Sequence, residues 1–202
     1  TRNRIIAEAI DGEKLEWRGT QAYGTLSVYF QQTPYTGWVK RMDTNGQIEM
    51  LSQFKDGKRD GLSTYWRTKL AWWDSGGQKL SECTYKDGKR DGLEARWYKN
   101  GEKNVESTWK DDKLVTAVVW KPNGERCPET GVDENGNAVW VHYNDDGAED
   151  GRDFYRDGKF VSWMQIERWD NGQKKSETTL KDEKRDGLWA YWHENGQKHR
   201  EE

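Results

Sequence analysis

The sequence has little proline, little cysteine and no long apolar run. Its 202 residues include three prolines and two cysteines. No apolar stretch approaches the roughly 20 residues that a membrane-spanning helix needs, and no signal-peptide pattern is visible. Cys83 and Cys127 do not form a C-x-x-C pair, so we interpret them either as one disulfide or as two packed thiols. The compartment stays open, with the cytoplasm favoured over export.

The sequence also lacks a strong excess of either positive or negative charge. The 33 basic and 36 acidic residues leave a net charge of -3, which excludes the basic footprint of a nucleic-acid-binding protein. No P-loop, dinucleotide fingerprint or nucleophile elbow is present. The three histidines, His142, His193 and His199, have no cysteine or further histidine to complete a metal set. We therefore predict no catalytic residue, no cofactor and no metal site.

Large aromatic residues are what the sequence does have. Apolar residues make up 32% and charged residues 34% of the chain, whereas about 25% charged is typical. Such polarity favours disorder, but 13 Trp and 9 Tyr argue against it. Each buried aromatic ring removes about 150–250 Å² from water. The composition predicts a folded chain with a thin core built from a few large rings.

Glycines recur at a regular spacing. Asn-Gly or a close equivalent ends at seven positions, which lie 23 to 25 residues apart except for 31 between the first two: Gly46, Gly77, Gly101, Gly124, Gly147, Gly172 and Gly196. A second turn position follows the first six by 11 or 12 residues. The repeat is therefore about two dozen residues with two turns. The long first interval predicts an insertion within residues 65–74.

The residues between the turns alternate as they do in β-strands. The patterns Leu62-x-Thr64-x-Trp66, Leu93-x-Ala95-x-Trp97 and Leu188-x-Ala190-x-Trp192 agree position for position. A period of two places their members on one strand face. In other strands a Glu stands three residues before the terminal large residue, so the two point to opposite faces; these glutamates are Glu82, Glu106 and Glu177.

The two turns of each repeat differ. Asn-Gly and Asp-Gly favour two-residue type I′ hairpin turns, because both residues tolerate positive φ. We expect the Asn-Gly end to be tight. The other end carries Lys-Asp-Gly-Lys-Arg-Asp-Gly at residues 55–61 and 86–92. Seven residues with two glycines predict a wider loop or a bulged turn there.

This pattern resembles the MORN repeat variant. The matching motif is aromatic-x-x-Asn-Gly-Gln-Lys-x-x-Glu-x-x-Tyr-Lys-Asp-Gly-Lys-x-Asp-Gly, clearest at residues 169–181 and 79–92, and it extends over roughly residues 34–197. Bacterial chains of this kind are often classed with the YwqK-type antitoxins, which are thought to neutralise a toxin. Related repeats act as scaffolds or associate with membranes. The resemblance supplies no catalytic residue.

The predicted fold is all-β. Consecutive hairpins pair with their neighbours, so we expect an elongated, single-layer antiparallel meander. Residues 1–35 form an N-terminal cap, and residues 36–202 form an array of about six units. The central stretch 120–151 keeps the spacing but loses the motif and gains Pro122, Cys127 and Pro128. It marks either a specialised surface or relaxed packing.

Tryptophans are the leading candidates for a binding role. Trp97, Trp109 and Trp192 lie in the repeat register, where packing is the expected role. Trp72 and Trp73 lie in the insertion together with Lys69 and Arg67. Aromatic and basic residues on a protruding segment are typical of a binding site, although packing of the insertion against the sheet remains an equal alternative.

We therefore predict a non-enzymatic protein–protein interaction module, of the kind found in bacterial antitoxins and immunity proteins. A membrane- or lipid-associated scaffold is a second hypothesis, which requires a basic face. A carbohydrate-binding or surface-structural protein that stacks exposed tryptophans on sugars is a third. The partner expected on the first hypothesis is another protein, with a toxin as the leading class.

Overall fold

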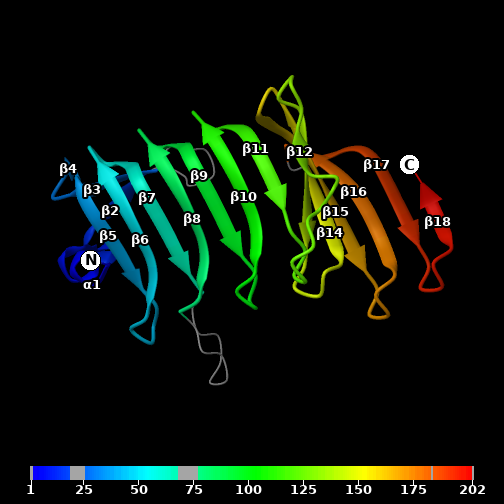
Figure 1. Ribbon diagram of the computed structural model, residues 1–202, viewed down its shortest axis with the longest axis horizontal. Helices are drawn as coiled ribbons and strands as arrows, with labels where there is room; N and C mark the ends of the chain where they lie inside the picture. The colour runs from blue at the N-terminus through cyan, green and yellow to red at the C-terminus, as the bar shows by residue number, and fades with distance from the viewer. Residues whose placement is uncertain (1, 19–25, 68–76, 183, 202) are drawn as a thin grey trace. The chain divides into compact units, whose positions relative to one another are not determined.

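The computed structural model describes residues 2–18, 26–67, 77–182 and 184–201. Strands account for 63% of it and helix for 4%, which confirms the all-β prediction (Figure 1). The chain divides into two compact units, Thr1–Asp112 and Lys113–Glu202. No described helix has the length and apolarity needed to cross a membrane.

The first sheet has eight strands in the order β1-β5-β6-β7-β8-β9-β10-β11. Neighbouring strands from β5 to β10 are antiparallel, and β1 pairs in parallel with β5 and so covers its edge. An antiparallel meander is therefore confirmed here. The strands are β1 (Ile10–Asp11), β5 (Gly37–Met42), β6 (Ile48–Lys55), β7 (Lys58–Trp66), β8 (Lys79–Lys86), β9 (Lys89–Trp97), β10 (Lys103–Lys110) and β11 (Lys113–Val119).

The N-terminal residues cover both faces at the start of this sheet. Helix α1 (Arg2–Glu8) packs on one face. The opposite face is covered by a small sheet and by the 3-10 helix η1 (Gly12–Lys14). The small sheet consists of β2 (Glu16–Arg18), β3 (Ser27–Phe30) and β4 (Thr33–Pro34). On that second face Leu15 and Val28 join Val39, Met50 and Phe54 in a buried apolar cluster. Leu15 and Val28 belong to the residues predicted as a cap, and the other three lie on β5 and β6.

The second sheet is also an antiparallel meander, with seven strands in the order β12-β13-β14-β15-β16-β17-β18. Its strands are β12 (Gly131–Val132), β13 (Ala138–Tyr143), β14 (Glu149–Arg156), β15 (Lys159–Arg168), β16 (Lys174–Lys181), β17 (Lys184–Trp192) and β18 (Lys198–Glu201).

The prediction for the two turn types is wrong about which end is tighter, but right that a bulge lies beside the Asp-Gly turn. The Asp-Gly end is the tight one, because Asp56 (φ 49°) and Gly57 (φ 80°) form a two-residue turn between paired Lys55 and Lys58. The wider loop or bulged turn predicted at the Asp-Gly end is a β-bulge beside the turn, because the register shifts between Ser52 and Phe54. At the Asn-Gly end, Asp43 accepts a hydrogen bond from Gly46 N and donates one to Gln47 O. That geometry is a three-residue loop in which the glycine provides the left-handed position.

The predicted strand faces are confirmed by the register. Glu82 lies opposite both Thr64 and Ala95, so it shares their face. Tyr85 lies opposite Arg90, on the other face. We call the face that carries Thr64, Glu82 and Ala95 the α1 face, because helix α1 packs on it. The opposite one is the inner face, where Ser52, Ser63, Cys83, Glu94 and Ser107 form one cross-strand row.

The repeat is interrupted between β11 and β12, within the stretch that departs from the motif. A turn after Trp120 brings Arg126 opposite it, and Cys127 N donates to Val119 O at 2.8 Å. The next residue is Pro128, which has no N–H to continue the ladder. Cys83 and Cys127 are both buried and unbonded, so the interpretation as packed thiols holds and the disulfide does not form.

Candidate functional site

The α1 face is covered at its start by apolar residues of the N-terminal helix. Ile5 and Ile6 pack on a buried cluster of Ala9, Leu51 and Trp66. Lys40 Nζ donates to Ile6 O at 2.9 Å and fixes the end of the helix. These contacts show that this face of the sheet accepts an amphipathic helix.

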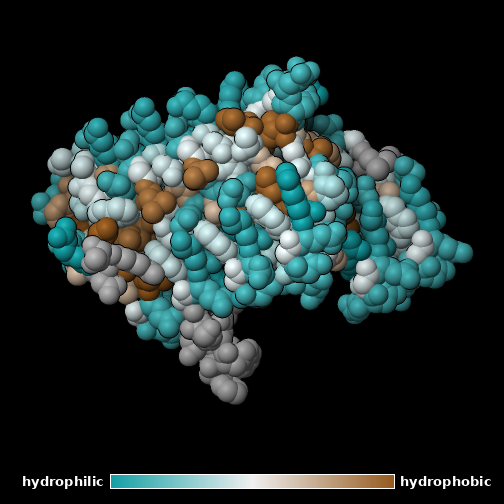
Figure 2. All heavy atoms as spheres, viewed as in Figure 1, coloured by the Kyte–Doolittle hydropathy of each residue, from teal (hydrophilic) through white to brown (hydrophobic). Residues whose placement is uncertain are grey.

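Beyond α1 the same face is open and carries exposed leucines. Leu62 is 41% exposed, Leu80 38% and Leu93 64%. The register places Leu62 opposite Thr84 and Leu93 opposite Thr108, so both lie on the α1 face. Figure 2 shows hydrophobic patches between polar residues on the side of the molecule it presents. Exposed apolar residues grouped on one face are typical of a protein interaction site.

Several charged residues on this face are paired with one another. Lys79 Nζ lies 2.6 Å from Glu82 Oε2 and 4.9 Å from the centroid of the Trp97 ring. Lys103 and Glu106 repeat the ion pair at 2.6 Å. In the second unit, Lys174 Nζ lies 2.5 Å from Glu177 Oε2 and 5.0 Å from the centroid of the Trp192 ring. Because each of these three lysines has its own carboxylate, this Lys-x-x-Glu pattern adds no net positive charge to the surface.

The inner face of the first sheet carries a row of arginines against aromatic rings. The Cζ atom of Arg90 lies 3.4 Å from the ring centroid of Trp109. Arg59 lies 5.3 Å from the centroid of Tyr85. The Trp109 indole donates to Glu94 Oε2 at 2.6 Å. These contacts stabilise the bent Asp-Gly hairpins over the inner face.

Burial on the inner face holds two groups in their neutral forms. Burial, with a smaller effect of the Glu94 charge, raises the pKa of the Cys83 thiol to about 12. Burial also raises the pKa of Tyr85. Neither group supplies a nucleophile near neutral pH, because the thiolate and the phenolate are the reactive forms.

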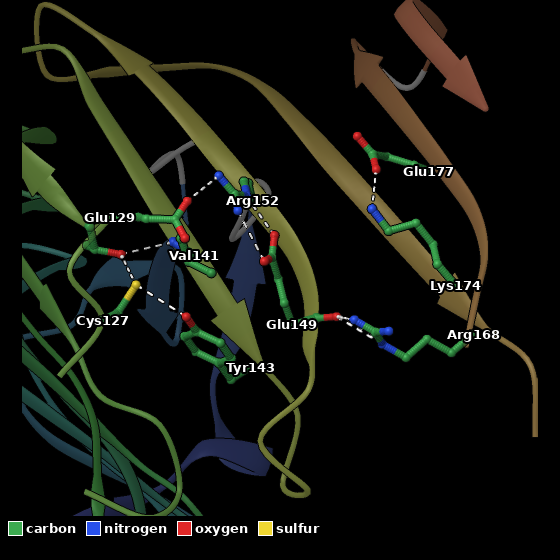
Figure 3. Close-up of polar contacts among 10 residues, drawn as sticks. Cys127, Glu129, Val141, Tyr143, Glu149, Arg152, Arg168, Lys174 and Glu177 are labelled. Carbon is green, nitrogen blue, oxygen red and sulfur yellow. Dashed lines mark hydrogen bonds and ion pairs between the residues drawn. The ribbon is translucent and has the colours of Figure 1, made fainter. Parts of the chain in front are cut away.

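A second cluster of polar residues lies where the repeat is interrupted, around Cys127 (Figure 3). The Cys127 sulfur accepts hydrogen bonds from the hydroxyls of Tyr143 at 3.3 Å and Thr130 at 3.6 Å. Burial alone would raise the pKa of Cys127, but these hydrogen bonds outweigh it and lower that pKa below its ordinary value. Thr130 Oγ1 also accepts the N–H of Val141 at 3.2 Å, which ties the cluster to β13.

Arg152 links the irregular segment to the second sheet. Its guanidinium contacts Glu129 at 2.7 Å and Glu149 at 2.6 Å. An open groove of about 760 Å³ runs beside it, lined among others by Glu129, Thr130, Val139, Phe154 and Val161. The stretch 120–151 thus contributes part of the groove wall.

The predicted binding residues are only partly described. Lys69, Trp72 and Trp73 lie outside the described residues. Arg67 follows β7, and its Nη2 donates to Trp97 O at 3.1 Å. Its backbone pairs with Gln78 and Gly77 at 2.8 and 2.9 Å. Arg67 is therefore hydrogen-bonded to the end of β9 at the base of the insertion.

The tryptophans expected to pack divide between the two faces. Trp109 is 2% exposed on the inner face, whereas Trp97 and Trp192 are half-buried beside lysines. Sequence analysis missed the groove and the exposure of the leucines. The arginines of the inner face had a signal in the sequence, since Arg59 and Arg90 occupy the same place in two copies of the Lys-Asp-Gly-Lys-Arg motif.

The histidines form no metal set among the residues that the structure describes, and no group of three His, Cys, Asp or Glu side chains converges there. His142 Nε2 lies 3.1 Å from Asp153 Oδ2. The rings of His193 and His199 lie 4.6 Å apart, edge to face, and both residues are exposed.

No protein-family model and no curated protein matches this chain. The resemblance to the MORN repeat variant therefore depends on the motif alone and stays a prediction.

Proposed function

We propose that this protein is a non-enzymatic binding module whose partner is another protein, docked on the α1 face of the first sheet. The observation that carries this proposal is the pair of exposed leucines, Leu62 and Leu93, on the same face that α1 covers at its start. Buried apolar contacts at the centre of an interface supply most of its binding energy. The resemblance to YwqK-type antitoxins makes a toxin the leading partner class.

The paired charges favour a protein partner over a membrane. Attraction to an anionic bilayer needs unpaired lysines, each worth about 1 kcal/mol near the surface. On the α1 face Lys79 and Lys103 are paired with Glu82 and Glu106.

Co-expression with the product of the neighbouring gene tests this function. We expect growth to be rescued and a stoichiometric complex to elute on size exclusion. Leu93→Glu should weaken that complex about tenfold or more, because it places a charge in the apolar contact. Phe30→Glu is the matched control, since Phe30 is 39% exposed and lies on β3, outside the first sheet. Equal loss in both variants, or no complex, would contradict the proposal.

A further inference from the structure

Arg59 is a buried cation with no carboxylate beside it. It is 7% exposed on the inner face of the first sheet. Its Nη2 donates to the Tyr65 hydroxyl at 2.6 Å, and its guanidinium faces the rings of Tyr65 and Tyr85. These partners are uncharged, and its buried Nε has no hydrogen-bond partner among the described residues. A guanidinium that stays protonated in such a place requires a counter-charge.

Arg90 occupies the equivalent position one repeat later and has that counter-charge. The carbonyl of each arginine accepts a hydrogen bond from the next hairpin tip, Arg59 O from Gly88 N at 2.8 Å and Arg90 O from Asp112 N at 3.0 Å. The Asp112 carboxylate lies 3.4 Å from Arg90 Nε. At Arg59 the corresponding tip residue is glycine, which has no carboxylate. The two arginines thus occupy the same place in successive repeats, but only Arg90, whose side chain is 31% exposed, has its counter-charge built in.

Two hydroxyls lie on the inner face next to Arg59. Ser52 and Ser63 are opposite each other in the β6–β7 ladder, and Phe54 opposite Arg59 is the next pair toward the tip. Both serines are 0% exposed, and neither hydroxyl has a hydrogen-bond partner among the described residues. Arg59 donates to Tyr65, which lies two residues beyond Ser63 on the same strand, so the Arg59 side chain extends along the inner face in the direction of these hydroxyls.

Nearby groups do not balance the charge of Arg59. Glu94 is the buried carboxylate of the same face, but it binds Arg96 at 2.7 Å and the Trp109 indole at 2.6 Å. Cys83 lies opposite Ser63, and burial raises the pKa of its thiol to about 12, so it is uncharged at neutral pH.

We propose that Arg59, Ser52 and Ser63 bind a small inorganic anion of the halide class, in the role that the Asp112 carboxylate plays for Arg90. A halide accepts hydrogen bonds from the Nε–H and from both hydroxyls without a required orientation. It also neutralises the guanidinium, which a water molecule in the same place does not. The site lies on the face opposite the proposed docking surface and is independent of the proposed function.

Thermal unfolding of the full chain in sodium chloride and in sodium gluconate, at equal ionic strength, tests the proposal. Gluconate is too large for a buried site. We expect Tm to be about 3–6 °C higher in chloride when its concentration is ten times the Kd. Gly88→Asp supplies the missing carboxylate and should remove the difference, as should Arg59→Met. An unchanged Tm in the wild type, or an equal chloride response in a folded variant, overturns the proposal.

Bromide provides a test that needs no variant. Crystals grown in sodium bromide should give an anomalous peak beside Arg59 Nε, within hydrogen-bond distance of Ser52 and Ser63. Density at that position without an anomalous signal identifies water and overturns the proposal.

Discussion

The guanidinium of Arg90 lies on the indole of Trp109, with its Cζ 3.4 Å from the ring centroid. The same indole donates to the buried Glu94 at 2.6 Å. We expect Trp109→Ala to lower the free energy of unfolding by about 3–5 kcal/mol, because it leaves a cavity and removes a donor to a buried carboxylate. Guanidinium unfolding followed by circular dichroism measures this.

Trp97→Ala is the comparison for that prediction. Trp97 is half-buried on the α1 face and contacts Lys79 at the surface. Its loss should lower the free energy of unfolding by about 1–2 kcal/mol, because a half-buried ring buries less apolar area than Trp109 does. Equal destabilisation by the two substitutions would show that the inner face contributes no more than the α1 face.

The raised pKa of the Cys83 thiol predicts how the free energy of unfolding changes in alkaline solution. Burial raises the pKa of the folded thiol from its ordinary value of 9.0 to about 12. Between these values the unfolded chain releases the proton while the folded chain keeps it, so the stabilisation present at lower pH is lost as the pH rises. The slope is at most about 1.4 kcal/mol per pH unit. Cys83→Ala should show a shallower fall than the wild type in urea unfolding above pH 9. A parallel fall would assign the effect to other groups, such as Tyr85.

Cys127 should respond to the loss of one hydroxyl. Tyr143 donates to its sulfur at 3.3 Å, and such hydrogen bonds outweigh burial and lower the pKa of Cys127. Tyr143→Phe is expected to raise that pKa, because a donor to the thiolate is removed. The ultraviolet absorbance of the thiolate, titrated with pH in a Cys83→Ala background, measures it. Tyr191→Phe is the control and should leave the titration unchanged.

The sequence predicts the strands of this fold better than its surfaces. Period-two alternation and regular glycines locate the hairpins, because both depend on local backbone chemistry. The sequence did not show which turn is the tighter one, because Asn-Gly and Asp-Gly favour the same conformation. The flanking bulge decides between the two loop lengths. Leu93 illustrates the limit at the candidate site. A pattern assigns it to the face of Trp97, but its 64% exposure depends on how far α1 extends over that face.

The glycines of the two turn types should differ in their tolerance of a side chain. Gly101 has φ 85° and Gly158 φ 70°, so alanine is strained at both. A Cβ at Gly101 meets nothing within 4 Å, whereas one at Gly158 lies 2.7 Å from Leu114 O. We expect Gly101→Ala to cost about 1–2 kcal/mol from the backbone alone. Gly158→Ala should cost about 1–3 kcal/mol more, because the backbone of β11 has to move. Equal costs in urea unfolding would mean that the contact between this hairpin tip and β11 contributes little to stability.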